Sequence, residues 1–234
     1  MTMARVEAFR AGVQVAGVHD LAEAQLILGA GATALGFPLR LPEPREDLTE
    51  DEAAAVIAAC SPVPRVLITY QGDPEAVAAF ADALGVDWVQ LHGAVTVVQV
   101  EALRRLRPAL GLLKALVVAG SDPAPVLAEA EAFAPLVDAF ITDTFDQRTG
   151  QRGATGRTHP WAVSRAVVEA RLAPVILAGG LDPTNVAEAI AAVRPWAVDA
   201  HTGLEGRDGR KTRPRVEAFC RNTAEAFQRH PPTR

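Results

Sequence analysis

Cysteine, aromatic residues and long apolar runs are all scarce in this sequence of 234 residues. It contains only two cysteines, Cys60 and Cys220, and they lie far apart in the chain. Two distant cysteines are more typical of buried thiols in a reducing cytosol than of a disulfide framework, so we expect a cytoplasmic protein. Aromatic residues make up 5% of the chain, so its core must be built largely from Ala, Val and Leu.

Other absences exclude whole classes of protein. No apolar run is long enough to cross a membrane, and the N-terminus lacks the pattern of a secretory signal. Acidic residues outnumber basic ones, 28 against 23, and no basic stripe with interleaved aromatics indicates a nucleic-acid surface. No Gly-x-Gly-x-x-Gly follows the first predicted strand, which removes the main support for a dinucleotide-binding domain. We therefore expect no membrane or nucleic acid as partner, and no cofactor.

Short apolar segments alternate with helical patterns along the whole chain. With 49% hydrophobic residues, the chain can bury the core of one large domain. The apolar segments predict strands at Val13–Gly17, Ala34–Phe37, Val66–Thr69, Asp87–Leu91, Leu112–Val117, Ala139–Thr142, Val175–Ala178 and Ala197–Ala200. The intervening segments predict helices at Leu21–Leu28, Thr49–Ala59, Pro74–Leu84, Val95–Leu106, Pro125–Phe133, Pro160–Arg171, Thr184–Val193 and Arg213–Gln228.

This alternation indicates an α/β protein with a parallel sheet, either closed as a barrel or open and doubly wound. Eight units over this length favour a single (βα)8 TIM barrel over residues 1–234, with a loose tail at 229–234. The active sites of such barrels lie where the strands end. Two loops at that end, Pro38–Leu48 and Phe145–His159, are longer than a connection requires, which is typical of functional loops.

The seventh and eighth units carry a pattern typical of phosphate binding. Val175–Leu181 reads Val-Ile-Leu-Ala-Gly-Gly-Leu and leads into a predicted helix. Glycines let the backbone approach a ligand closely, and a helix N-terminus offers free N–H groups. A second turn, His-Thr-Gly at 201–203, follows the neighbouring strand. We predict a phosphate clamp made of Gly179, Gly180, Thr202 and Gly203. The alternative is a pair of tight turns without a ligand.

Six segments, spread in order over nearly the whole chain, carry a family pattern. They are Val13–Gly17, Ala34–Phe37, Val89–Gly93, Val175–Leu181, Asn185–Ile190 and Val193–Asp199. Gln-Leu-His-Gly at 90–93 and Leu-Ala-Gly-Gly-Leu at 177–181 are the most specific when taken together. The pattern resembles phosphoribosylanthranilate isomerase, the (βα)8 barrel of the tryptophan pathway. The resemblance implies a barrel of the ribulose-phosphate-binding type.

The resemblance also implies a reaction, the Amadori rearrangement of a phosphorylated aminoaldose. A general acid protonates the ring oxygen, which opens the sugar to a Schiff base, and a general base removes the proton on C2. The position that matches the acid is Asp143, at the end of the sixth strand. Burial there raises the pKa of a carboxyl and suits it to donate a proton near neutral pH. The alternative for Asp143 is a capping residue.

The family's base is missing from the first strand. The family pattern Lys-Ile-Cys-Gly, whose cysteine is the base, is replaced by Gln-Val-Ala-Gly at 14–17, and Ala16 cannot accept a proton. The family's Ser-Ser-Gly after the eighth strand is His-Thr-Gly, and its Thr-Arg after the first is His19-Asp20. Because the first and eighth strands of a barrel adjoin, His201 is a candidate replacement base. Substrate contact or drift are its alternatives, and for His19 we favour a solvated loop residue.

Three further positions match substrate contacts. Arg45 matches the arginine that pairs with the anthranilate carboxylate, as a guanidinium fork suits that group. Asp199 ends the eighth strand and is a candidate to hold a sugar hydroxyl, while His92 is expected to order the fourth loop beside the substrate. The spacing of the histidines carries no metal-ligand signature, so we predict no metal site.

The leading hypothesis is an aldose–ketose isomerase of this family, acting as a monomer or homodimer on a small phosphorylated sugar. The second is a divergent paralogue with different chemistry on a sugar phosphate, because the first strand lost Cys and Lys while the eighth gained His. The third is a non-catalytic barrel that binds a phosphorylated ligand. It follows from the loss of an essential base in an otherwise retained pattern.

Overall fold

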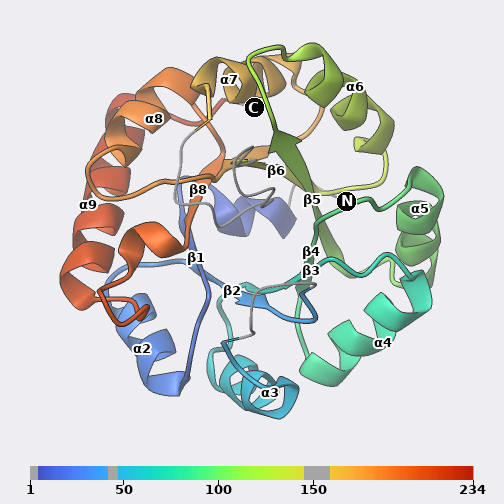
Figure 1. Cartoon of the computed structure of the whole chain (residues 1–234), viewed down its shortest axis with the longest axis horizontal. Coiled ribbons are helices and arrows are strands. Elements are labelled where there is room, and N and C mark those ends of the chain that lie inside the picture. Colours follow the sequence, from blue (N-terminus) through green and yellow to red (C-terminus); the bar gives the residue numbers. More distant parts are fainter. Residues whose placement is uncertain (1–4, 42–46, 145–158, 234) are drawn as a thin grey trace.

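The computed structural model describes residues 5–41, 47–144 and 159–233, and within these ranges eight parallel strands close into a barrel (Figure 1). The strands are β1 (Val13–Ala16), β2 (Ala34–Pro38), β3 (Arg65–Thr69), β4 (Trp88–Leu91), β5 (Gly111–Val118), β6 (Ala139–Thr144), β7 (Val175–Leu177) and β8 (Ala197–Ala200). Each strand pairs with the next, and β8 pairs with β1. The predicted (βα)8 barrel is confirmed.

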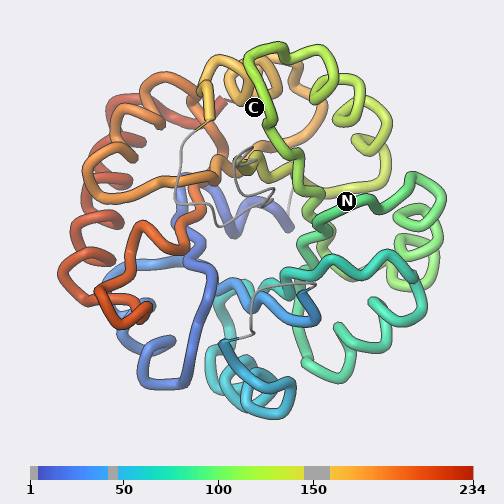
Figure 2. The backbone as a smooth tube through the Cα atoms, viewed as in Figure 1, coloured from blue at the N-terminus to red at the C-terminus, as the bar shows by residue number. Residues whose placement is uncertain are grey.

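Helices surround the barrel as an outer ring (Figures 1 and 2). They are α2 (Leu21–Gly29), α3 (Glu50–Ala59), α4 (Pro74–Leu84), α5 (Val97–Leu106), α6 (Ala124–Phe133), α7 (Trp161–Ala170), α8 (Val186–Val193) and α9 (Arg213–Arg229), with short 3-10 helices η1 (Glu7–Phe9) and η2 (Thr202–Leu204). None of the helices in the described ranges is both long and apolar enough to span a bilayer.

Two helices begin two residues later than predicted, α5 because a side chain caps it there and α8 because a turn precedes it. Thr96 caps α5 and exchanges hydrogen bonds with Gln99, so the helix begins at Val97. Before α8, Asp182 accepts hydrogen bonds from the amides of Thr184 and Asn185, which folds this segment into a turn. These local hydrogen bonds compete with the helix for the same backbone amides.

The segment before β1 closes the bottom of the barrel, a feature that the sequence did not predict. Val6 and Phe9 are fully buried with the residues that fill the barrel interior. The Phe9 and Trp88 rings meet edge to face, with their centroids 4.9 Å apart. The Trp196 indole donates a hydrogen bond to the Val6 carbonyl. Trp88 begins β4 and Trp196 precedes β8, so this plug lies at the amino ends of the strands. Figure 2 shows the blue N-terminal segment crossing the centre of the ring.

The C-terminal segment is held more closely than the predicted loose tail at 229–234. Arg229 is still part of α9, whose Phe219 and Phe227 are buried in the outer core. Beyond the helix, the Thr233 amide donates a hydrogen bond to the Arg194 carbonyl at 3.2 Å. In the described part of the tail, this bond ties the chain to the C-terminal end of α8.

Candidate active site

Inward-facing side chains form a row across the carboxyl ends of four adjacent strands. The strand register aligns this level: on the outer face, Thr142 of β6 pairs with Leu177 of β7 and Leu177 with Val198 of β8, while Asp199 of β8 pairs with Gln14 of β1. One residue further along β6 and β8, Asp143 and Asp199 face the interior at the same level. Residue 178 between them on β7 is alanine, whose small side chain is buried with the residues that fill the barrel interior.

Burial changes the acidity of both carboxyl groups. It raises the pKa of Asp143 to about 6, against the opposing effect of the Thr144 amide that donates to Oδ1 at 2.7 Å. Burial raises the pKa of Asp199 to about 7, and the neighbouring charge of Asp143 adds to this rise. The Asp199 Oδ1 atom has no hydrogen-bond partner among the described residues. The pair therefore holds about one proton near neutral pH, which suits it to acid–base chemistry.

A chain of polar side chains continues this row toward β4. The Gln14 side-chain amide donates to Gln90 Oε1 at 3.1 Å, and the Gln90 amide donates to His92 Nε2 at 2.6 Å. The His92 ring stacks on Tyr70, and burial together with the Lys114 charge lowers its pKa to about 4. The ring is therefore neutral, with its proton on Nδ1, which has no partner within the described ranges. His92 can donate this N–H to a ligand in the barrel mouth.

His201 covers the end of β1, where the family's base would stand. A Cβ atom added to Gly17, whose φ is +75°, would lie 2.1 Å from His201 Nε2. Burial, Lys211 and His19 lower the pKa of His201 to about 3, so the imidazole is neutral at neutral pH. General bases are most effective when their pKa lies near the working pH. The role of His201 as base remains a prediction, and this environment weighs against it.

A buried lysine that the sequence did not single out joins the two ends of the chain at this place. Lys211 Nζ donates to the Gly17 carbonyl at 2.9 Å and to Glu205 Oε1 at 3.0 Å. Its own amide donates to Glu23 at the start of α2. His19 belongs to the same network, since its ring bonds Glu23 Oε2 at 2.8 Å and approaches Asp47 Oδ1 at 3.3 Å. The expectation that His19 is a solvated loop residue was therefore wrong.

The predicted phosphate turns lie against each other. Gly179 and Gly180 have φ values of +92° and +65°, and a Cβ atom on Gly179 would lie 2.2 Å from Thr144 Oγ1. A Cβ atom on Gly203 would lie 2.0 Å from the Leu181 carbonyl oxygen, so the two turns pack backbone to backbone. Thr202 begins η2 at this contact. The structure thus brings the four residues of the predicted clamp together, and both turns require glycine on steric grounds.

A second polar chain, also missed in the sequence, fixes the outer side of β6. His159 Nδ1 lies 3.0 Å from Thr144 Oγ1, its Nε2 lies 2.5 Å from Ser164 Oγ, and Ser164 donates to Thr142 Oγ1. Burial lowers the pKa of His159 to about 4, so this ring is neutral too. The chain anchors the strand end that carries Asp143 and supports Gly179 from behind. The one signal for it in the sequence is a serine on the apolar face of α7.

Other candidates lie elsewhere or are already engaged. Arg45 lies outside the described residues. Arg40 pairs with Glu50 at 2.6 Å and stacks over the Phe80 ring at 3.7 Å, so it serves the packing of α3 and α4. Within the described ranges, no three His, Cys, Asp or Glu side chains lie close enough to hold a metal ion.

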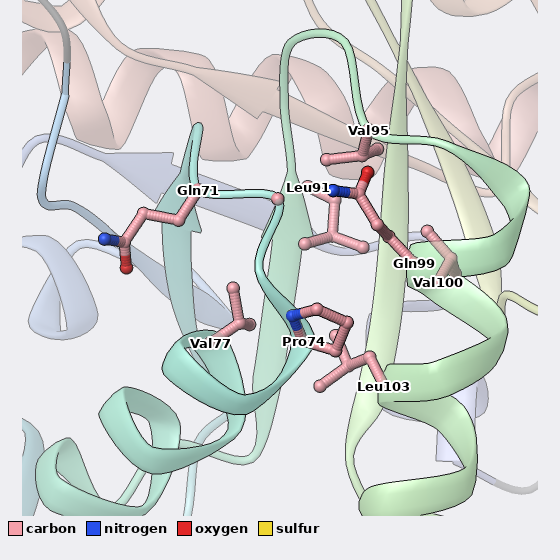
Figure 3. Close-up of a pocket in the computed structure, with 9 residues that line it drawn as sticks. Gln71, Pro74, Val77, Leu91, Val95, Gln99, Val100 and Leu103 are labelled. Atoms are coloured by element: carbon pink, nitrogen blue, oxygen red, sulfur yellow. The ribbon is translucent and has the colours of Figure 1, made fainter.

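A small cavity lies outside the barrel between α4 and α5 (Figure 3). Its volume is about 10 Å³ and its walls are mostly apolar, with Val77, Leu91 and Leu103 among them. This is about the room that a single water molecule needs, so the cavity cannot hold a substrate.

The fold, with acidic side chains at its strand ends, places the chain in the class of (βα)8 barrels, whose active sites lie at the carboxyl end. The family model for N-(5'-phosphoribosyl)anthranilate (PRA) isomerase matches residues 13–222. The chain belongs to this family.

Relatives of known name agree with this family over most of the chain. An N-(5'-phosphoribosyl)anthranilate isomerase 2 from Methanosarcina mazei is 34% identical, covering 92% of this chain and 95% of the relative. An N-(5'-phosphoribosyl)anthranilate isomerase from Haloferax volcanii is 38% identical, with coverage of 88% and 90%.

Solved structures show the same fold. Phosphoribosyl anthranilate isomerase from Thermus thermophilus has a TM-score of 0.75 at 29% identity, covering 92% of this chain and 98% of the other. A second phosphoribosyl anthranilate isomerase, in complex with reduced 1-(o-carboxyphenylamino)-1-deoxyribulose 5-phosphate, has a TM-score of 0.75 at 26% identity with the same coverage.

Proposed function

We propose that this protein isomerises N-(5'-phosphoribosyl)anthranilate, as an aldose–ketose isomerase of tryptophan biosynthesis. The observation that carries the proposal is the pair of buried carboxyl groups, Asp143 and Asp199, which end β6 and β8 and interact through their charges, in a barrel of this family. One shared proton in such a pair supplies both an acid and a base at neutral pH.

Asp143 donates its proton to the ring oxygen of the substrate. The bond between this oxygen and C1 breaks, and the nitrogen lone pair forms the C1=N bond of the Schiff base. Removal of the C2 proton then moves the C–H electrons into a C1=C2 bond and returns the imine electrons to nitrogen. The resulting enol gains a proton on C1 and loses its hydroxyl proton. Substrate and product are isomers, so the reaction consumes no net oxidant or reductant.

The remaining predicted residues bind the two ends of the substrate. The backbone amides around Gly179, Gly180, Thr202 and Gly203 hold the phosphate, supported by the packing of the two turns against each other. Arg45 pairs with the anthranilate carboxylate. The neutral His92 ring donates its Nδ1 proton to a substrate oxygen. We expect the protein to work as a monomer or homodimer in the cytoplasm, where its two free, buried cysteines stay reduced.

The test is turnover of freshly generated phosphoribosylanthranilate by the purified protein, followed by anthranilate fluorescence. Wild-type protein should turn over, and Ala16→Cys should turn over as well because it adds a thiol at the inward end of β1. Asp143→Asn is the matched variant without the acid, and it should lose about 10²-fold or more in kcat. If folded wild-type protein shows no turnover, the proposed isomerase activity is wrong.

A second candidate function is different chemistry on a sugar phosphate. The observation that favours it is the closed end of β1, where Ala16 lacks a proton acceptor and the His201 ring covers Gly17. It predicts that phosphorylated sugars raise the melting temperature of the wild type without conversion of phosphoribosylanthranilate. Turnover by wild type and by Ala16→Cys at similar rates would exclude it.

A further inference from the structure

The C2 proton of the substrate needs an acceptor, and the usual candidates in this chain are unsuitable. Cys60 ends α3 and Cys220 lies in α9, and both pack in the core between barrel and helices. Burial raises the pKa of both thiols, so little of either is present as the thiolate that could accept a proton at neutral pH. His201 is neutral, but the charge of Lys211 and its burial make it a weak acceptor. The base must therefore be another inward-facing group.

Asp199 is such a group on geometric grounds. It ends the inward row of β8, it is 8% exposed, and its Oδ1 atom has no partner among the described residues. A buried carboxylate oxygen without a donor is costly in a folded protein unless a ligand or a proton uses it. Its neighbour in register on β1 is Gln14, which lies one inward step below Ala16. Asp199 therefore lies on the strand next to β1, where Ala16 at the family's base position cannot take a proton.

We propose that Asp199 removes the C2 proton, replacing the base that position 16 lacks. This inference rests on the proposed isomerase function and names a catalytic residue for it. The Asp199 carboxylate forms a new O–H bond with the proton from C2. The electrons of the broken C–H bond form C1=C2, and the imine electron pair returns to the anthranilate nitrogen. The proton that Asp199 gains then leaves by transfer to C1 or to solvent, which restores the carboxylate.

The groups around Asp199 support this role. Gln14 on β1 is neutral, Ala178 on β7 is apolar, and His201 further along the same strand end is uncharged. Burial and the charge of Asp143 on β6 raise the pKa of Asp199, while the Gln14 side-chain hydrogen bond and the Lys211 ammonium group lower it. The pKa values of the two carboxyl groups, about 6 and about 7, differ by one unit. The form with the proton on Asp143 and the charge on Asp199 is therefore the less populated of the two singly protonated forms, and the reaction draws on this minor form.

The test compares Asp199→Asn with a matched control, Asp87→Asn. Asp87 precedes β4 at the opposite end of the barrel, where it pairs with Arg65 on the surface. We expect Asp199→Asn to lower kcat by about 10²- to 10⁴-fold with KM changed less than threefold. With substrate deuterated at C2, the isotope effect on kcat of Asp199→Asn should be at least as large as the isotope effect on kcat of wild type. Asp87→Asn should keep wild-type kcat and KM.

Three outcomes would overturn the inference while the isomerase function stands. The first is an Asp199→Asn variant that retains more than a tenth of wild-type kcat. The second is a loss confined to KM, which indicates that Asp199 only holds a sugar hydroxyl. The third is loss of the C2 isotope effect, which places the damage in ring opening. If Asp199→Asn keeps its activity, as in the first outcome, and His201→Gln loses kcat, then His201 is the base. Absence of turnover in wild type, in contrast, overturns the proposed function and the inference together.

Discussion

At the scale of single residues, Asp199 has opposite effects on chemistry and on stability. Its carboxyl is buried without a partner for Oδ1, and its pKa rises from 3.8 to about 7. Well below pH 3.8 the carboxyl is protonated in the folded and in the unfolded chain, so it does not affect the balance between them. As the pH rises from about 4 to 7, the unfolded chain ionises first, and the folded state loses stability. The residue proposed as base therefore destabilises the fold at neutral pH.

This predicts a pH-dependent gain of stability in Asp199→Asn, because asparagine stays neutral at every pH. Above pH 7 the variant should be more stable than wild type by on the order of 2 to 4 kcal/mol, and the gain should fade toward pH 4. The measurement is urea unfolding of both proteins at pH 4.5 and pH 8. A variant that is less stable than wild type at pH 8, or equally affected at both pH values, would show that ionisation of a buried Asp199 does not destabilise the fold.

At the scale of elements, the turn between β7 and α8 depends on a close fit to the end of β6. Gly179 has a left-handed backbone and lies against Thr144 Oγ1, which the His159 chain holds in place. Gly85, at the end of α4, has φ of +68° and open space around it. Both glycines therefore have a left-handed backbone that disfavours other residues, but an added Cβ atom would clash with a neighbour only at Gly179.

Gly85→Ala should cost about 1 kcal/mol of stability, from backbone strain alone, and leave KM unchanged. Gly179→Ala adds a clash 2.2 Å from Thr144 Oγ1 and should also raise KM for the phosphorylated substrate at least tenfold. Urea unfolding and steady-state kinetics on both variants separate the two effects. The same KM in both variants would show that the β7 turn does not contact the substrate.

At the scale of the whole molecule, the two ends of the barrel have separate tasks. The carboxyl end holds the polar row, while Phe9 and Val6 seal the amino end against Trp88 and Trp196. Apolar layers of the barrel interior lie between the two ends. Changes to the plug should therefore act on stability and not on chemistry.

Phe9→Ala should destabilise the protein by about 3 to 5 kcal/mol, because it removes a fully buried aromatic ring and leaves a cavity. Its kcat at about 20 °C should stay within about twofold of wild type, since the plug lies at the end remote from Asp143. Val98→Ala, at a side chain that is 69% exposed, is the control and should change stability by less than about 0.5 kcal/mol. A large loss of kcat in folded Phe9→Ala would show that the two ends are coupled.

The sequence by itself determined the order of strands and helices and hence the barrel, because the apolar periods that define these elements are local. It also determined that Asp143, Asp199 and the glycine turns meet, since the carboxyl ends of parallel strands share one end of a barrel. The start of α5 at Val97 was displaced by a capping side chain and that of α8 at Val186 by the turn at Asp182, local hydrogen bonds that the apolar period does not show.

Only the tertiary structure decided how the meeting residues differ in chemistry. Nothing in the local sequence distinguishes Asp199 from His201 as a base. Burial and the charge of Asp143 raise the pKa of Asp199, while burial and the ammonium group of Lys211 lower the pKa of His201. These influences come from other strands and loops. The N-terminal plug was likewise invisible, because a short apolar segment becomes part of the core only when the barrel provides a surface to cover. The pKa values of Asp199 and His201 and the closing of the barrel by the N-terminal plug both depend on residues distant in the chain. Only folding brings these residues together.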